Sequence, residues 1–267
     1  MVRAALRTGL VAVLLAGWLA GGAAAQAASC RLALVLALDV SSSVDEREYI
    51  LQRDGAAAAL GDPDIRRAIL SGPGHVALAV YEWSGRRQNA LVLDWTALRS
   101  DADIDRAIAT LRGFPRSQTR FPTAMGYALG YGATLLAKGP QCARRVIDVS
   151  GDGITNDGFG PDLAYKHFPF QGVTVNGLAI LGADPMVADY YEFNVMHGPN
   201  AFVELSEGYE GYRRAMTRKL FREISNMVVG DLAPLPAPVS SSPAQAAGTD
   251  GPGRNAGDGA AGATPPG

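Results

Sequence analysis

Short apolar runs alternate with helical patterns through the middle of this chain. Strand-like runs occupy residues 32–38, 76–83, 90–93, 146–150, 173–181 and 202–204. Strands that alternate with helices form a largely parallel sheet that is covered by helices on both faces. The sequence therefore predicts an α/β fold, in which three layers are doubly wound around a mostly parallel six-stranded sheet.

One connection between these runs is too short for a helix. Residues 76–83 and 90–93 are joined through Ser84 and Gly85, which indicates a hairpin and therefore one antiparallel edge strand. Apolar spacing predicts helices over residues 101–111 and 123–136, the second containing Gly126, Gly130 and Gly132 for close packing. A last helix repeats Met216, Leu220, Ile224 and Met227.

The two ends of the chain differ from this middle part. Arg3 and Arg7 precede an apolar stretch and then small residues, the layout of a secretory signal over residues 1–27, with cleavage expected after Ala27. The apolar stretch is too short for a membrane span, so none is expected in the mature chain. Residues 231–267 are rich in Pro, Ala, Gly and Ser, which predicts a disordered tail. Residues 30–229 remain for one domain, which is expected to be exported to the periplasm or the cell exterior.

The charge of the chain argues against nucleic-acid binding. The chain has 24 basic and 26 acidic residues, and the predicted signal contains two of the basic residues and no acidic one. The mature chain therefore carries a net charge of −4. It lacks the basic excess that is typical of proteins that bind nucleic acids.

Two aspartates follow predicted strands. Asp39 comes directly after the run 32–38, and Asp152 lies just past the run 146–150. In open α/β sheets, ligands bind at the carboxyl ends of the strands, where the strand order reverses. A ligand site is therefore expected at these two aspartates.

Three stretches carry a resemblance to a known family. They are Asp39-Val40-Ser41-Ser42-Ser43, Thr123-Ala124-Met125-Gly126-Tyr127-Ala128-Leu129 and Val146-Ile147-Asp148-Val149-Ser150-Gly151-Asp152-Gly153. Together they resemble the von Willebrand factor A family, most closely its secreted bacterial members of unknown function. The metal-ion-dependent adhesion site (MIDAS) of that family uses Asp-x-Ser-x-Ser, a later Thr and an Asp after the fourth strand. The resemblance covers residues 32–227 and implies five metal ligands, which are Asp39, Ser41, Ser43, Thr123 and Asp152.

The threonine ligand has a rival in the same loop. In the family, the threonine stands six residues before the leucine of an Ala-Leu pair, and Thr123 and Leu129 keep that spacing. The loop before Thr123 lacks the glycine pair that is common in the family. Thr119 therefore remains an alternative ligand.

The chemistry of these side chains suits a hard cation. Carboxylate and hydroxyl oxygens favour Mg²⁺, Mn²⁺ or Ca²⁺ over zinc, and the five oxygens approach the octahedral shell that Mg²⁺ prefers. The resemblance implies that one position stays open for an oxygen from a protein or another acidic partner. The predicted function is therefore cation-dependent binding of such a partner, with Mg²⁺ as the favoured ion.

Each motif also has a purely structural interpretation. Ser43 and Glu46 match a helix capping box, Thr123 could cap the helix that it opens, and Asp152 could belong only to a turn. None of these interpretations accounts for the three stretches together. Asp148, in the middle of a predicted strand, is expected to be a buried carboxylate with a structural partner.

A metal-dependent hydrolase is the alternative function. A subtilisin-like order of Asp39 and His75 would place Ala124 at the nucleophile, and the chain has no Gly-x-Ser-x-Gly motif. A phosphoesterase would need a base or nucleophile near the ion, and none is evident. The chain is therefore predicted not to be an enzyme. A scaffold whose cation only stabilises the loops is a further alternative.

The two cysteines are predicted to form a disulfide. Cys30 lies nine residues before Asp39, and Cys142 lies ten residues before Asp152. The sheet order of the resembled family makes the two strands parallel neighbours, which places both cysteines at adjacent amino ends. Neighbouring strands lie ~4.8 Å apart, within the range of Cα separations that a disulfide bridges. The alternative is two free thiols, with Cys30 lipidated or disordered.

Overall fold

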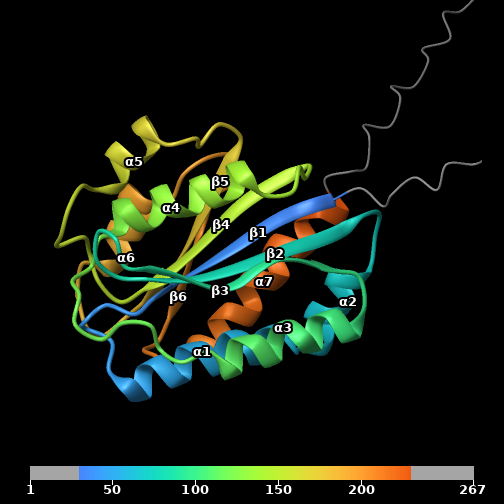
Figure 1. Cartoon of the computed structure of the whole chain (residues 1–267), viewed down its shortest axis with the longest axis horizontal. Coiled ribbons are helices and arrows are strands. Elements are labelled where there is room, and N and C mark those ends of the chain that lie inside the picture. Colours follow the sequence, from blue (N-terminus) through green and yellow to red (C-terminus); the bar gives the residue numbers. More distant parts are fainter. Residues whose placement is uncertain (1–29, 230–267) are drawn as a thin grey trace, which may run out of the picture. The chain divides into compact units, whose positions relative to one another are not determined.

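A six-stranded sheet lies between two layers of helices in the computed structural model, which describes residues 30–229 (Figure 1). The strands are β1 (Cys30–Asp39), β2 (His75–Trp83), β3 (Asn89–Leu98), β4 (Arg144–Gly151), β5 (Val173–Ile180) and β6 (Val203–Ser206). The helices are α1 (Glu46–Leu60), α2 (Pro63–Leu70), α3 (Asp101–Gly113), α4 (Met125–Lys138), α5 (Pro161–His167), α6 (Val187–Tyr190), the π-helix η1 (Tyr191–Val195) and α7 (Tyr212–Val229).

The two predicted end segments lie outside this region. The predicted signal, residues 1–27, and the predicted tail, residues 231–267, both fall beyond the described residues. Between residues 30 and 229, no helix is long and apolar enough to cross a membrane.

The order of the strands positions the carboxyl ends of β1 and β4 side by side. The order is β3-β2-β1-β4-β5-β6, with β1 parallel to both β2 and β4. β5 and β6 continue the parallel part, whereas β3 is antiparallel to β2 at the edge. The predicted fold class and the antiparallel edge strand are confirmed. The chain runs outward from β1 to β3 and returns at β4, so the strand order reverses between β1 and β4, where ligands bind in such sheets.

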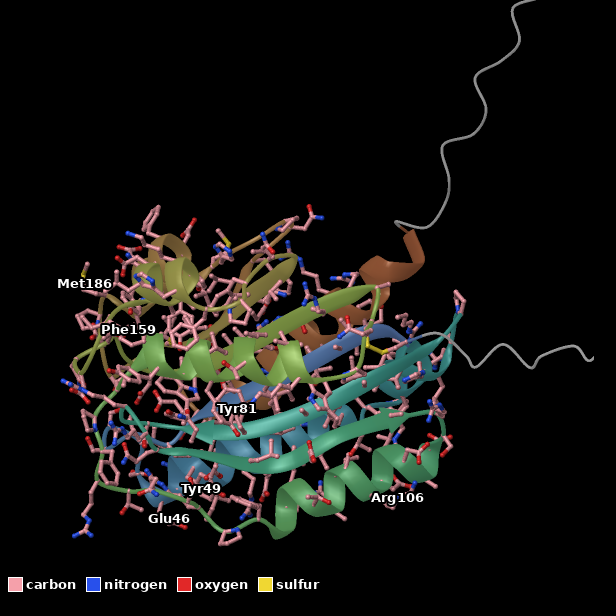
Figure 2. The ribbon with its side chains drawn as sticks, turned by 45° about the horizontal axis from the view of Figure 1, so that its top comes forward. Glu46, Tyr49, Tyr81, Arg106, Phe159 and Met186 are labelled. Carbon is pink, nitrogen blue, oxygen red and sulfur yellow. A yellow bond between two sulfur atoms is a disulfide. The ribbon has the colours of Figure 1, made fainter. Side chains whose placement is uncertain are left out.

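β1 separates two hydrophobic cores, because its side chains alternate between the two faces of the sheet. The core beneath α1, α2, α3 and α7 receives Leu32, Leu34, Leu36 and Leu38. The core beneath α4, α5 and η1 receives the smaller Ala33, Val35 and Ala37. On this second side, Tyr81 lies between the sheet and α4 (Figure 2), and its hydroxyl donates to the Ala128 carbonyl at 2.7 Å. The glycines of α4 allow this close packing, since a Cβ on Gly132 would lie 2.9 Å from the Tyr81 hydroxyl.

Several elements differ from the sequence prediction, and three of them are informative. β3 continues to Leu98 although Asp94 interrupts its apolar run, because a shift of register keeps the strand paired with β2. α2 is absent from the prediction; it begins at Pro63, directly after an Asp62 that caps it. α4 begins at Met125, two residues after the predicted start.

A disulfide joins Cys30 and Cys142, as predicted. Cys30 is the first residue of β1, and Cys142 lies just before β4, so the bond fastens the amino ends of the two central strands. The Cα atoms are 4.6 Å apart, and the sulfur–sulfur bond is drawn in yellow in Figure 2. The Ala143 amide also donates to the Cys30 carbonyl at 3.0 Å.

Asp148 in β4 has a buried structural partner, which confirms its predicted role. The Lys219 ammonium of α7 lies 2.7 Å from Asp148 Oδ1 and 2.8 Å from Glu223 Oε1, and both ion pairs are fully buried. Asn176 of β5 donates to the same Glu223 oxygen at 2.7 Å. Burial, with the negative charge of Glu223, raises the pKa of Asp148 to about 8, and Lys219 opposes that rise. Burial acts to lower the pKa of Lys219, but the two carboxylates together raise it above its usual value.

Candidate metal centre

Asp39 is the last residue of β1 and is fully buried. Its Oδ1 atom accepts a hydrogen bond from the Ser41 amide at 2.7 Å, which turns the chain sharply at the end of the strand. Its backbone carbonyl accepts from Gln52 Nε2 of α1 at 2.8 Å. The carboxylate is therefore held at the carboxyl edge of the sheet. Figure 1 shows this edge at the left, where β1 ends.

A chain of hydrogen bonds links the other four predicted residues. Thr123 Oγ1 lies 3.2 Å from Ser41 Oγ, and Ser41 Oγ lies 3.1 Å from Ser43 Oγ. Ser43 Oγ donates in turn to Asp152 Oδ1 at 2.8 Å. Side chains from three loops, far apart in sequence, thus come together in one cluster of oxygens.

The structure separates the two candidate threonines. Thr123 is 3% exposed and belongs to the hydrogen-bond chain. Thr119 is exposed on the loop before α4. The geometry therefore favours Thr123 as the residue that belongs to the cluster.

The helix-capping interpretations of Ser43 and Thr123 are wrong. α1 is capped by Asp45, whose side chain accepts from the Glu48 amide at 2.8 Å while Glu48 Oε2 accepts from the Asp45 amide at 2.8 Å. The capping box therefore lies two residues beyond Ser43, because the chain needs the intervening turn to leave the sheet. α4 has Ala124 at its N-cap and no side-chain cap, so the Thr123 hydroxyl is not used by the helix.

Two negative charges are buried side by side in the cluster. Burial raises the pKa of Asp39 to about 7, and the charge of Asp152 adds to that rise, while hydrogen bonds from Ser41 and the charge of Arg116 oppose it. Burial also raises the pKa of Asp152, against the hydrogen bond from Ser43 and a weaker interaction with the nearby Tyr209 hydroxyl. The Oδ2 atoms of both aspartates are buried and have no hydrogen-bond partner in the described part of the chain.

This donor set fits a divalent cation of the hard class. Three hydroxyls and two carboxylates are all oxygen donors, and the two mutually repelling carboxylates would be stabilised by a positive charge between them. Within residues 30–229 there is no group of three or more His, Cys, Asp or Glu that could hold a metal ion, so a metal here would depend on the hydroxyls as well as on the two aspartates. The cluster is therefore the candidate metal centre.

Arg116 stabilises the loop that contains Ser41 and Ser43, a role that the sequence does not reveal. Its guanidinium donates to the carbonyls of Val40, Ser41 and Val44 at 3.3, 3.1 and 2.6 Å. Ser42 forms a further hydrogen bond between the two loops: its amide donates to the Phe121 carbonyl at 2.8 Å. The loop before Thr123 thus holds the loop of Ser41 and Ser43 in place.

Two further residues of the site are tyrosines that sequence reasoning misses. The hydroxyls of Tyr191 and Tyr209 are buried beside the aspartates and lack hydrogen-bond partners among the described residues. Burial raises the pKa of both tyrosines, and the charges of Asp39 and Asp152 add to the rise, so the hydroxyls stay protonated. A buried hydroxyl without a partner costs about 1–3 kcal/mol, so this pair is unusual for a folded protein.

A comparison with known protein families identifies the family to which the chain belongs. A family described as a protein of unknown function (DUF1194) matches residues 29–228. The chain belongs to the DUF1194 family. No curated protein matches this DUF1194 chain in sequence.

Solved structures show the fold of this DUF1194 domain. The pilus adhesin SpaC from Lactobacillus rhamnosus GG is 14% identical, with a TM-score of 0.55 over 74% of this chain and 31% of its own. Proximal thread matrix protein 1 of the mussel byssus, in a form with a zinc-occupied MIDAS motif, is 13% identical, with a TM-score of 0.53 over 74% and 46%. A mutant of the PilB minor pilin from Streptococcus sanguinis is 13% identical, with a TM-score of 0.54 over 76% of this chain and 64% of its own.

These similarities confirm the von Willebrand factor A fold that the sequence motifs predicted. At 13% and 14% identity, they concern the fold alone. The DUF1194 chain spans between about a third and two thirds of the length of these relatives.

The subtilisin-like interpretation does not fit the DUF1194 structure. His75 begins β2 and lies in register with Cys30, whereas Asp39 lies in register with Trp83. The histidine and the aspartate therefore lie at opposite ends of neighbouring parallel strands. They cannot form a catalytic pair.

Proposed function

We propose that this DUF1194 domain is an exported binding module that holds a divalent cation at Asp39, Ser41, Ser43, Thr123 and Asp152. Through the cation it binds a protein or another acidic partner. The observation that best supports this is the cluster itself: two buried aspartates share one site with three hydroxyls at the carboxyl edge of the sheet. A cation would satisfy both carboxylates and leave one position for an oxygen of the partner.

The choice of ion and compartment follows from the chemistry of the chain. All five donors are hard oxygens, which favours Mg²⁺, with Mn²⁺ or Ca²⁺ as alternatives. The secretory signal predicted over residues 1–27 and the disulfide both agree with export to the periplasm or beyond, since disulfides persist in oxidising compartments. The similarity in fold to a pilus adhesin and a byssus matrix protein is consistent with that location.

We propose binding rather than catalysis, because the histidines are placed away from the cluster. His75 begins β2, His167 ends α5, and His197 bridges to Val175 near the start of β5. Lys219, a further base by type, is committed to its buried ion pairs. A hydrolase would need a base at the open position of the cation.

The first prediction concerns the two aspartates. A saturating concentration of Mg²⁺ or Mn²⁺, at about 100 times the dissociation constant, should stabilise the protein by about 2.7 kcal/mol, because only the folded state holds the ion. Asp39→Asn and Asp152→Asn should abolish this gain while remaining folded, since each keeps the shape of the side chain and removes one buried charge. Thermal unfolding with the cation and with chelator measures the difference.

Asp45→Asn is the matched control for these variants. Asp45 lies in the same loop but caps α1, and asparagine is an equally good N-cap. This variant should keep the full response to the cation. Equal cation binding by the wild type, Asp39→Asn and Asp152→Asn in calorimetry would overturn the site. Partner capture from the cell envelope should likewise require the cation and fail with Asp39→Asn.

The second prediction ranks the threonines. Thr123→Val should weaken cation binding by about tenfold or more, because it removes a buried oxygen of the cluster and leaves its neighbours unsatisfied. Thr119→Val should change the affinity by less than about twofold, since its side chain is exposed on the loop. Calorimetric titration of both variants gives the ranking. The opposite order would show that Thr119 is the ligand.

A further inference from the structure

Two buried tyrosines converge on the aspartates from different parts of the chain. Tyr191 is the first residue of η1 and is 0% exposed, and Tyr209 lies in the turn between β6 and α7 and is 4% exposed. A π-helix is rare and often marks a functional position. Both hydroxyls are buried without a partner, and the same is true of Asp39 Oδ2 and Asp152 Oδ2. Two donors without acceptors therefore lie beside two acceptors without donors.

Two glycines allow the ring of Tyr191 to reach this place. A Cβ on Gly177 of β5 would lie 2.5 Å from Tyr191 Cδ1. A Cβ on Gly151 of β4 would lie 2.8 Å from the Tyr191 hydroxyl and 2.7 Å from Asp39 Oδ2. The Tyr191 hydroxyl and Asp39 Oδ2 therefore both lie close to Gly151. Glycine inside a strand is typical of such a close approach.

The orientation of each carboxylate leaves one oxygen for a tyrosine. Asp39 Oδ1 accepts from the Ser41 amide, and Asp152 Oδ1 accepts from Ser43 Oγ. The Oδ2 atoms carry no such bond. The Tyr209 hydroxyl is near enough to Asp152 to act against the rise of the Asp152 pKa, and it is buried without a hydrogen-bond partner among the described residues.

We propose that Tyr191 and Tyr209 are positioning residues of the cation site, donating to Asp39 Oδ2 and Asp152 Oδ2 respectively. This inference rests on the proposed function. A donor behind a ligating carboxylate fixes its orientation, and loss of such a donor lowers metal affinity by about 10- to 100-fold. The hydroxyls would thus set the direction in which the two aspartates face the cation.

The test separates this role from a structural one. Tyr191→Phe and Tyr209→Phe should each bind Mn²⁺ about 10- to 100-fold more weakly in calorimetry. In chelator, their melting temperatures should equal or exceed that of the wild type, because phenylalanine keeps the buried ring and removes an unpaired hydroxyl. Tyr81→Phe is the matched control, since that buried hydroxyl is bonded to the Ala128 carbonyl. It should melt earlier in chelator and bind Mn²⁺ normally.

Each alternative result is decisive. Mn²⁺ binding within twofold of the wild type in both tyrosine variants would overturn the positioning role and leave the cation site intact. Lower melting temperatures in chelator, with unchanged Mn²⁺ affinity, would assign the tyrosines to stability alone and also overturn it. Absence of Mn²⁺ binding by the wild type would overturn the cation site together with this inference.

Discussion

Replacing Lys219 with methionine is expected to lower the unfolding free energy by about 3–5 kcal/mol at neutral pH. The Lys219 ammonium is fully buried between Asp148 and Glu223, at 2.7 and 2.8 Å. Methionine fills a similar volume but leaves two carboxylates in the core without a positive charge. Removing one partner of a buried ion pair is strongly destabilising because the remaining charge is uncompensated. Urea unfolding of both proteins measures the loss.

The loss should also grow as the pH rises. The pKa of Asp148 is already raised to about 8, and Lys219 acts to lower it, so the variant should raise it further. The folded protein then holds a proton that the unfolded chain releases above about pH 4. Raising the pH therefore favours the unfolded chain, through the range from the unfolded pKa to the folded one. Because the folded wild type also holds this proton up to about pH 8, the difference between variant and wild type should stay nearly constant from pH 5 to pH 7 and grow above about pH 8.

Arg218→Met provides the control for Lys219→Met. Arg218 is the preceding residue of α7, and its ion pair with Glu204 lies at the surface, with the Arg218 side chain 58% exposed. Surface pairs of this kind contribute about 0–1 kcal/mol. A Lys219→Met protein as stable as Arg218→Met would contradict the view that the buried charges depend on each other.

Loss of the disulfide should have an effect of similar size. Cys30 and Cys142 are separated by 112 positions, so the bond greatly restricts the unfolded chain. Chain entropy alone gives about 4.7 kcal/mol for a loop of roughly 100 residues, and measured values are commonly about 2–5 kcal/mol. We expect the double variant Cys30→Ala, Cys142→Ala to lose stability within that range, measured by denaturant unfolding without reductant.

The single cysteine variants sharpen this prediction. Either substitution breaks the same bond, so each single variant should lose about as much stability as the double variant. Losses that add up from two singles would indicate separate packing roles for the two thiols. Mass spectrometry of the native protein should find one crosslinked peptide pair. Two cysteines that react with an alkylating agent in the folded protein would contradict the bond.

The central strands could be predicted because strands that are buried on both faces have recognisably apolar sequences. β1 and β4 are covered on both faces, so β1 reads as an unbroken apolar run that ends at Asp39, and β4 as a mostly apolar run, interrupted by Asp148, that ends near Asp152. The edge strand β3 was predicted too short, because edge strands tolerate polar residues such as Asp94. Asp94 forms local hydrogen bonds with Trp95 and Thr96 at an irregularity in the register of β3, and the pairing resumes at Thr96.

The parts of the site that the sequence does not reveal depend on long-range packing. Asp-x-Ser-x-Ser is a local motif, so Asp39, Ser41 and Ser43 can be found without a fold. Tyr191 and Tyr209 have no local pattern, because their meeting with the aspartates depends on how η1 and the turn after β6 pack on the sheet. The capping alternative for Ser43 fails for a related reason: the local pattern fits two registers, and the N-cap of α1 is Asp45.

The disulfide and the oxygen cluster fasten opposite ends of the same two strands. If a bound partner were to pull on Asp39 while the domain was held at Cys30, tension would run along the axis of β1. The hydrogen-bond ladders to β2 and β4 would be loaded in shear, and their bonds would share the force instead of breaking in sequence. The covalent link at Cys30 would pass part of the load into β4. Under such a load, β1 would carry the tension from the oxygen cluster at one end to the disulfide at the other.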